Sequence, residues 1–102
     1  MDQKFTVRHH AVFKAWYLKL KMSRNSALYD VVFMRLERVR MGNLGDHKSV
    51  GDGVSELRFN VGAGLRIYYT RRGNDVIFLL CAGDKSSQQA DIMLAKQLSG
   101  EV

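Results

Sequence analysis

The chain has 102 residues, of which 46% are hydrophobic and 25% are charged, as in ordinary globular proteins. This length favours one domain over residues 1–102, because separate cores arise in much longer chains. The single Cys81 excludes an intramolecular disulfide framework, and no apolar run approaches the roughly 18 residues of a membrane-spanning helix. The N-terminus, MDQKFTVRHH, lacks the apolar core of a secretion signal. We therefore expect a soluble, cytoplasmic protein.

The net charge is +6, from sixteen Lys and Arg against ten Asp and Glu. This balance favours a polyanion or an acidic protein as the partner. The charge is unevenly spread, since residues 1–24 carry six cations and one acidic residue while residues 73–102 carry two cations and four acidic residues. Three histidines without clustered carboxylates predict no metal site, and we expect no cofactor.

The N-terminal part predicts a strand followed by two helices. Residues 4–8 alternate apolar and polar side chains, which is typical of a short strand at a sheet edge. A helix is predicted over residues 10–21, and a second from the polar break at 23–26 to Met41, before Gly42-Asn43. We expect this helical hairpin to pack on a sheet through an apolar stripe that includes Phe13, Trp16, Tyr17 and Leu20.

The C-terminal part predicts strands and a last helix. Residues 57–61 and 65–70 alternate around Gly62-Ala63-Gly64, and a tight three-residue turn would pair Val61 with Leu65. The apolar residues then share one sheet face, while Arg58, Arg66 and Tyr68 share the other, with Tyr68 opposite Arg58. The apolar run 76–81 predicts an interior strand buried on both faces. A capping-box pattern, Ser86-x-x-Gln89, predicts a helix to about Leu98, with Asp91 in its first turn.

Three segments resemble one protein family. Residues 42–58, GNLGDHKSVGDGVSELR, follow the pattern GNxGDxKxVGxGVxELR. Residues 64–69, GLRIYY, are similar to a GYRVYY strand, and residues 83–92 resemble GGDKSxQxxDI. In this order, across residues 5–98, they resemble the RelE/ParE superfamily of toxins, most closely the HigB-like branch of addiction-module killer proteins. The chain departs from the pattern at Leu65 (commonly Tyr) and Ala63 (commonly Pro), and in a longer segment at 22–27.

The resemblance implies an α+β, RelE-like fold: an N-terminal strand and helical hairpin packed on a curved antiparallel sheet, with a short C-terminal helix. It also implies the toxin of a type II toxin–antitoxin system, with a small helix-turn-helix antitoxin as its partner, and it permits a toxin–antitoxin heterotetramer. Many relatives are ribosome-dependent mRNA endonucleases, so mRNA and the ribosome are further expected partners. The ParE-like relatives instead poison DNA gyrase, and fold analogy does not separate the two activities.

Metal-independent RNA cleavage by the 2′-hydroxyl needs a proton acceptor, cations at the phosphate and a donor for the leaving oxygen. Arg58 and Arg66 are candidate cations because the strand pattern places them on one face. Lys48 and Lys85 join them through the GDxK and GDK resemblance, and either lysine is a candidate base. We therefore expect an mRNA interferase, an endoribonuclease that inhibits translation and growth. The alternatives are a gyrase poison and an inactive antitoxin-binding or RNA-binding module of the same fold.

Each candidate residue has a structural alternative. Arg58 and Arg66 repel each other unless an acid joins them, and Glu56 or Asp84 is the candidate acid; a solvated sheet face is the alternative. Asp84 supports the cluster or caps a turn. Tyr68 stacks on an RNA base or only shields the sheet. Arg35 and Arg38, on the second predicted helix, are candidates to bind RNA or an acidic segment of the antitoxin. The alternative is that both are simply solvated.

Overall fold

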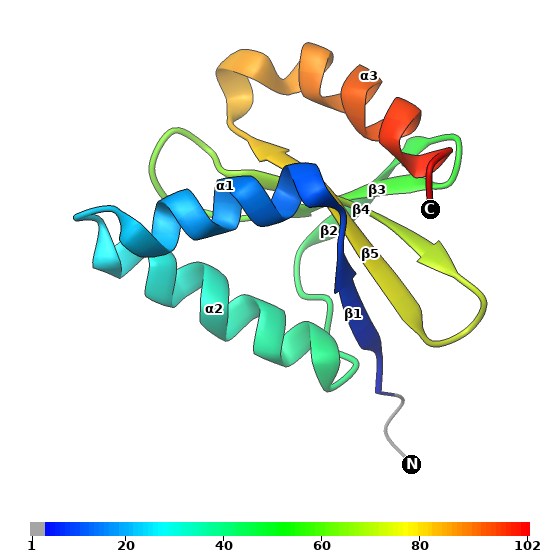
Figure 1. Cartoon of the computed structure of the whole chain (residues 1–102), viewed down its shortest axis with the longest axis horizontal. Helices are drawn as coiled ribbons and strands as arrows, with labels where there is room; N and C mark the ends of the chain where they lie inside the picture. Colours follow the sequence, from blue (N-terminus) through cyan, green and yellow to red (C-terminus); the bar gives the residue numbers. More distant parts are fainter. Residues whose placement is uncertain (1–3) are drawn as a thin grey trace.

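The computed structural model describes residues 4–102, in which a five-stranded sheet lies between a helical hairpin and one C-terminal helix (Figure 1). The strands are β1 (Thr6–His9), β2 (His47–Gly51), β3 (Val54–Arg58), β4 (Arg66–Arg72) and β5 (Val76–Gly83), in the spatial order β1-β5-β4-β3-β2. The helices are α1 (Ala11–Met22), α2 (Ser26–Arg40), the 3-10 turn η1 (Lys85–Ser87) and α3 (Gln88–Ser99). None of the helices within residues 4–102 has the length and apolar character to cross a membrane.

The helical hairpin forms where the apolar pattern predicts it. The His10 ring caps α1 by accepting the Val12 N–H at 3.0 Å, and the Asn25 side chain caps α2 by accepting the Leu28 N–H at 3.1 Å. The chain leaves α2 through Gly42, whose φ of +95° favours glycine. The predicted stripe is confirmed at Phe13, which is fully buried, and its other members pack against the same core.

The sheet is mixed, which corrects the expectation of an antiparallel sheet. β1 lies at one edge, as predicted, but runs parallel to β5, while the other pairs are antiparallel. The α1–α2 hairpin follows β1 and returns the chain at the far edge of the sheet, so β1 is left to pair with a strand distant in sequence.

The β3–β4 register differs by two residues from the prediction. Leu57 pairs with Ile67, and Arg58 pairs with Arg66 instead of Tyr68. The reason is a wide loop over residues 59–65, whose base is the 3.0 Å bond from the Phe59 N–H to the Leu65 carbonyl. The loop is also held from outside, since the Lys85 N–H donates to the Ala63 carbonyl at 3.3 Å. Because the shift is even, every side chain keeps its predicted face.

The face expected to be polar is covered by α3. A second core lies there, formed by Val54, Tyr68, Leu80, Cys81, Ala95 and Leu98. β5 is buried on both faces, as predicted. A register shift in the β4–β5 pairing, from Tyr68–Cys81 to Tyr69–Leu79, leaves Leu80 as an extra residue, and both Leu80 and Cys81 join the core beneath α3.

The start of the last helix is organised by Asp84 rather than by the predicted Ser86-x-x-Gln89 box. The Asp84 carboxylate accepts the Ser86 N–H at 2.8 Å, so η1 precedes α3. Asp91 lies in the first turn of α3, as predicted, and accepts the Ser87 hydroxyl at 2.5 Å. At the other end, the Arg72 guanidinium donates to the Ser99 carbonyl at 2.7 Å and fixes α3 against β4.

Replacing Gly83 by Ala should destabilise the fold, because a β-carbon there would collide with the Asp91 carboxylate and lie 2.8 Å from the Ser87 Oγ. Overpacking of this kind costs about 1–3 kcal/mol of unfolding free energy, measurable by urea denaturation. Gly100→Ala is the matched control, because its φ of −69° is helical and a β-carbon meets only the Gln97 carbonyl at 3.4 Å. Equal stability of the two variants would contradict the close packing at Gly83.

Candidate functional site

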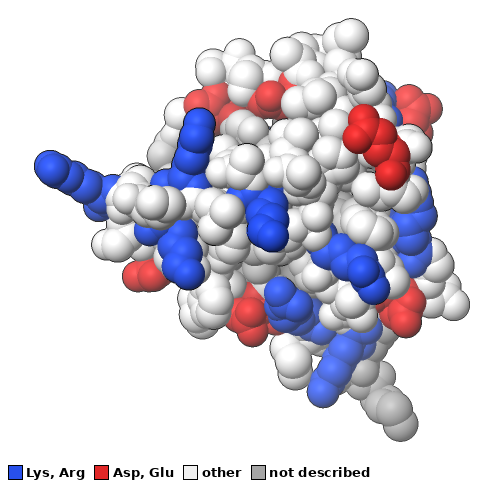
Figure 2. Space-filling view, viewed as in Figure 1, with Lys and Arg blue, Asp and Glu red and all other residues white. Residues whose placement is uncertain are grey.

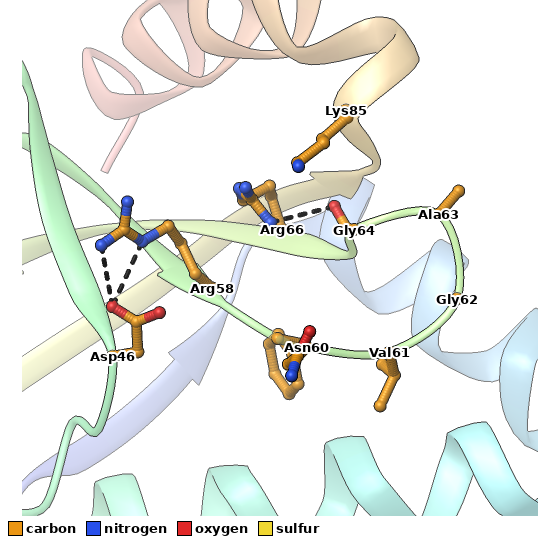
Figure 3. A pocket seen from close by; sticks show the side chains of 10 residues that line it. Asp46, Arg58, Asn60, Val61, Gly62, Ala63, Gly64, Arg66 and Lys85 are labelled. Carbon is orange, nitrogen blue, oxygen red and sulfur yellow. Dashed lines mark hydrogen bonds and ion pairs between the residues drawn. The ribbon is translucent and has the colours of Figure 1, made fainter.

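A polar pocket of about 530 Å³ opens where the hairpin of β3 and β4 meets η1 (Figure 3). The wide 59–65 loop forms one wall, the end of β3 and the start of β4 form the floor, and Lys85 closes the far side. The pocket therefore exists because the hairpin turn is wide. Its lining residues are Asp46, Arg58, Phe59, Asn60, Val61, Gly62, Ala63, Gly64, Arg66 and Lys85.

Three cations share this pocket with one carboxylate. Arg58 and Arg66 are directly paired across β3 and β4, and Lys85 comes from η1. The Lys85 stem lies against Gly64, where a β-carbon would come within 2.9 Å of its Cγ, and the ammonium points toward the Arg66 guanidinium (Figure 3). Asp46 is the acidic member of the lining. The excess positive charge suits the pocket to an anion such as a phosphate.

Arg58 is held by Asp46. Its Nη2 and Nε lie 2.9 and 3.2 Å from the same carboxylate oxygen, Oδ1. The side chain of Arg58 is 36% exposed and that of Asp46 is 62% exposed. An ion pair this exposed is weak, so an incoming anion can replace Asp46 as the partner of Arg58.

Arg66 is held more firmly because it is buried. Its Nη1 donates to the carbonyls of Gly64 and Leu65 at 3.1 and 3.2 Å. Its Nε lies 3.7 Å from the Glu56 carboxylate, which is 2% exposed and accepts the Gln88 side chain at 3.1 Å. Of the two candidate acids, Glu56 and Asp84, Glu56 is thus the one that pairs with Arg66. The Nε itself makes no hydrogen bond within residues 4–102.

The structure brings Arg58, Arg66 and Lys85 together but places Lys48 elsewhere. Lys48 is exposed on β2 opposite Glu56, and it lines a separate pocket of about 360 Å³ with His47 and Arg71. Asp84 does not line the cationic pocket either. Its carboxylate caps η1, so the turn-capping alternative is the one observed.

Tyr68 is fully buried beneath α3, which corrects its expected stacking on an RNA base. It lies opposite Glu56, and its hydroxyl has no hydrogen-bond partner in the described part of the chain. Burial, followed by the nearby Glu56 charge, raises the pKa of Tyr68. The side chain therefore shields the sheet, and it stays neutral at ordinary pH.

Arg35 is a structural residue, which corrects its expected role in binding RNA. Its guanidinium donates to three backbone carbonyls: Leu44 at 3.0 Å, Arg58 at 2.9 Å and Asp46 at 2.7 Å. It also lies 4.7 Å above the Phe59 ring. Burial lowers the pKa of Arg35. Arg35 thus fixes the loop that carries Asp46, whereas Arg38 is exposed on α2, outside the pocket lining.

Most other cations are spread over the surface. Figure 2 shows Lys and Arg side chains scattered across the face formed by α1 and α2, with acidic side chains near α3. This agrees with the uneven charge of the sequence. Scattered charges of this kind steer a polyanion toward the protein, whereas the pocket holds three cations at one place.

Sequence reasoning missed Asp46 as a site residue. It lies in the GDxK motif beside the predicted Lys48, but nothing in the strand pattern connects it with Arg58. The connection arises in the fold, where the Arg58 N–H donates to the Asp46 carbonyl at 2.9 Å and extends the β2–β3 pairing. The GDxK motif, which contains Asp46, was the signal in the sequence that could have identified it.

Arg35→Ala should lower the free energy of unfolding by about 2–3 kcal/mol, because three hydrogen bonds from a charged group are lost together. Arg38→Ala, four-fifths of a turn further along α2, removes an exposed charge and should change stability by less than about 0.5 kcal/mol. Urea denaturation of both variants measures the difference. Similar stability of the two would show that Arg35 does not anchor the loop.

The pKa of Asp84 should lie below the ordinary aspartate value, because the Ser86 hydroxyl and backbone N–H both donate to its carboxylate. A lowered pKa means that this cap stabilises the fold above the ordinary aspartate pKa and is lost as the pH falls through the folded value. Ser86→Ala removes the hydroxyl bond and should raise the Asp84 pKa, as measured by NMR titration of its carboxyl carbon. An unchanged pKa would contradict the cap.

The comparisons with known proteins identify a family. Residues 21–98 match the family model described as Phage derived protein Gp49-like (DUF891). An uncharacterized protein of Haemophilus influenzae is 43% identical over 90 residues, which are 88% of each chain. No solved structure matches the chain. The chain therefore belongs to the Gp49-like family of phage-derived proteins, within the RelE/ParE-like toxin superfamily.

Proposed function

We propose that this protein is the toxin of a type II toxin–antitoxin pair and acts as a metal-independent mRNA interferase. The observation that carries the proposal is the convergence of Arg58, Arg66 and Lys85 on one open pocket. Membership of the toxin superfamily supports it. The HigB-like branch, a RelE-like fold and cleavage on the ribosome are parts of the same proposal.

The pocket offers what RNA cleavage requires at the phosphate. When the 2′-oxygen attacks the adjacent phosphorus, negative charge builds up on the phosphate oxygens. Arg66 is suited to stabilise this charge, because its burial and its two carbonyl partners fix its position before substrate arrives. Arg58 is suited to bind the phosphate by exchange with Asp46. The exposed Lys85 ammonium donates a proton to the leaving 5′-oxygen.

The other partners follow from the same proposal. The cations of α1 and α2 attract mRNA and ribosomal RNA toward the protein. A small helix-turn-helix antitoxin binds and neutralises the toxin, and the toxin–antitoxin complex is compatible with a heterotetramer. Lys48 lies outside the pocket on β2, and the proposal assigns it a contact with a neighbouring phosphate of the same RNA.

Lys85→Ala should abolish growth inhibition on induction, because the pocket loses an exposed cation that points toward Arg66. Removing one such stabilising group lowers cleavage by about 100-fold to 1,000-fold. Lys19→Ala, an exposed lysine on α1, is the matched control and should remain toxic. Growth curves and primer extension on a reporter mRNA measure both effects.

The outcomes separate the candidate functions. Discrete cuts made by the wild-type protein and lost in the Lys85 variant support the interferase. Intact messages beside an SOS response indicate a gyrase poison, and a wild-type protein that is not toxic indicates an inactive module. A Lys85 variant as toxic as the parent would show that the pocket is not the active site.

A further inference from the structure

The carboxylate of Asp46 has one oxygen engaged and one available. Both Arg58 nitrogens bind Oδ1, and Oδ2 makes no hydrogen bond within residues 4–102. The side chain is 62% exposed and lines the cationic pocket. A substrate group can therefore reach Oδ2 without displacing protein.

The backbone of Asp46 is fixed independently of this carboxylate. Its carbonyl accepts the Arg35 Nη2 at 2.7 Å and the Arg58 N–H at 2.9 Å. Gly45, just before it, has a φ of +68°, and a β-carbon there would lie 2.9 Å from the Arg35 Nε. The carboxylate is thus presented by a rigid loop whose anchoring does not use it.

We propose that Asp46 accepts the proton of the attacking 2′-hydroxyl, after the RNA phosphate has taken Arg58 from it. This inference rests on the proposed function. The exchange is favourable in this pocket because the Arg58–Asp46 pair is exposed and the phosphate is held also by Arg66 and Lys85. Once the phosphate holds Arg58, both carboxylate oxygens of Asp46 are open to the 2′-hydroxyl.

The reaction balances with groups already in the pocket. The 2′-hydroxyl proton moves to Asp46 Oδ2 as the 2′-oxygen bonds to phosphorus. The bond from phosphorus to the 5′-oxygen breaks, and that oxygen takes a proton from Lys85. The products are a 2′,3′-cyclic phosphate and a 5′-hydroxyl end, and solvent returns the proton from Asp46 to Lys85.

Of the two lysines expected as candidate bases, Lys48 lines the separate pocket and Lys85 is the proton donor of the proposed reaction. The other candidate bases among the described residues are placed less well. Glu56 is buried and engaged by Gln88, and Asp84 is engaged by Ser86 outside the pocket lining. His47 follows Asp46 directly, but its Nδ1–H donates to the Gly45 carbonyl and its ring lines the other pocket. Asp46 is the one carboxylate that lines the pocket with the three cations.

Asp46→Asn tests the inference with little risk to the fold. Asn keeps an oxygen for Arg58 and leaves the backbone anchors unchanged. Asp52→Asn is the matched control, because Asp52 is also an exposed aspartate in an ion pair, 3.3 Å from Lys96 in the β2–β3 turn. Losing a general base should reduce the cuts seen by primer extension by at least about 100-fold, while the control stays within threefold of wild type.

Binding of an RNA that cannot be cut gives the second readout. A fluorescent 2′-O-methyl RNA oligonucleotide lacks the nucleophile, and fluorescence anisotropy measures its affinity. The Asp46 variant should bind it at least as tightly as wild type, because one acidic residue has left a cationic pocket. Asp46→Glu, which restores a carboxylate, should regain part of the cleavage.

Each result decides between the two ideas. Cuts by the Asp46→Asn variant within threefold of wild type would overturn the role of Asp46 and leave the interferase standing. Loss of binding together with cleavage would assign Asp46 to shaping the pocket, which also overturns the inference. Absence of cuts by the wild-type protein would remove both the proposed function and this role.

Discussion

Burial of the Arg66 guanidinium at the start of the central strand is the constraint on which the pocket depends. A buried cation needs an opposite charge and hydrogen-bond acceptors. Glu56 on β3 supplies the charge, and Gln88 at the start of α3 holds Glu56 in place. The carbonyls of Gly64 and Leu65 supply the acceptors, so the loop wraps the arginine. One buried cation thereby connects β3, β4, α3 and the loop that walls the pocket.

This arrangement leaves charge at the surface that the protein does not neutralise. Glu56 is paired with Arg66, so Asp46 is the one acidic residue left in the lining beside Arg58 and Lys85. Mutual repulsion of the three cations raises the free energy of the empty pocket, and a bound phosphate removes that cost. Because Arg66 is fixed and Arg58 is exchangeable, the pocket combines a rigid cation with one that changes partner. The proposed cleavage uses both properties.

Local patterns predicted the helices and most of the strands, but they did not predict β2 (His47–Gly51), and the strand expected over residues 57–61 lies at Val54–Arg58. The two helices, the edge strand and the buried β5 follow from periodicity, so they are found within a residue or two. The register error came from reading Gly62-Ala63-Gly64 as a tight turn, when the Lys85 N–H holds a wider one. The alternation in β4 was read as one exposed face, because nothing in a strand pattern shows that α3 returns to cover Tyr68.

The cations of the candidate pocket were predictable from the sequence, but the residue that anchors its loop was not. Arg58 and Arg66 follow from strand parity, which survives an even register shift, and Lys85 follows from its motif. The role of Arg35 was not predictable, since a helical arginine with three carbonyl partners looks like a solvated one in sequence.

In the loop that carries Asp46, the backbone has a structural role and the Asp46 side chain belongs to the pocket. The carbonyls of Leu44 and Asp46 are bound by Arg35, so the backbone of the motif is structural. The Asp46 carboxylate points the other way, to Arg58 in the pocket. Glycine at position 45 lets the Arg35 guanidinium approach closely enough to make those bonds. Gly45 and Asp46 of the motif therefore have different roles. Gly45 makes room for the Arg35 guanidinium, which fixes the backbone of the loop, and this leaves the Asp46 carboxylate free to exchange its partner.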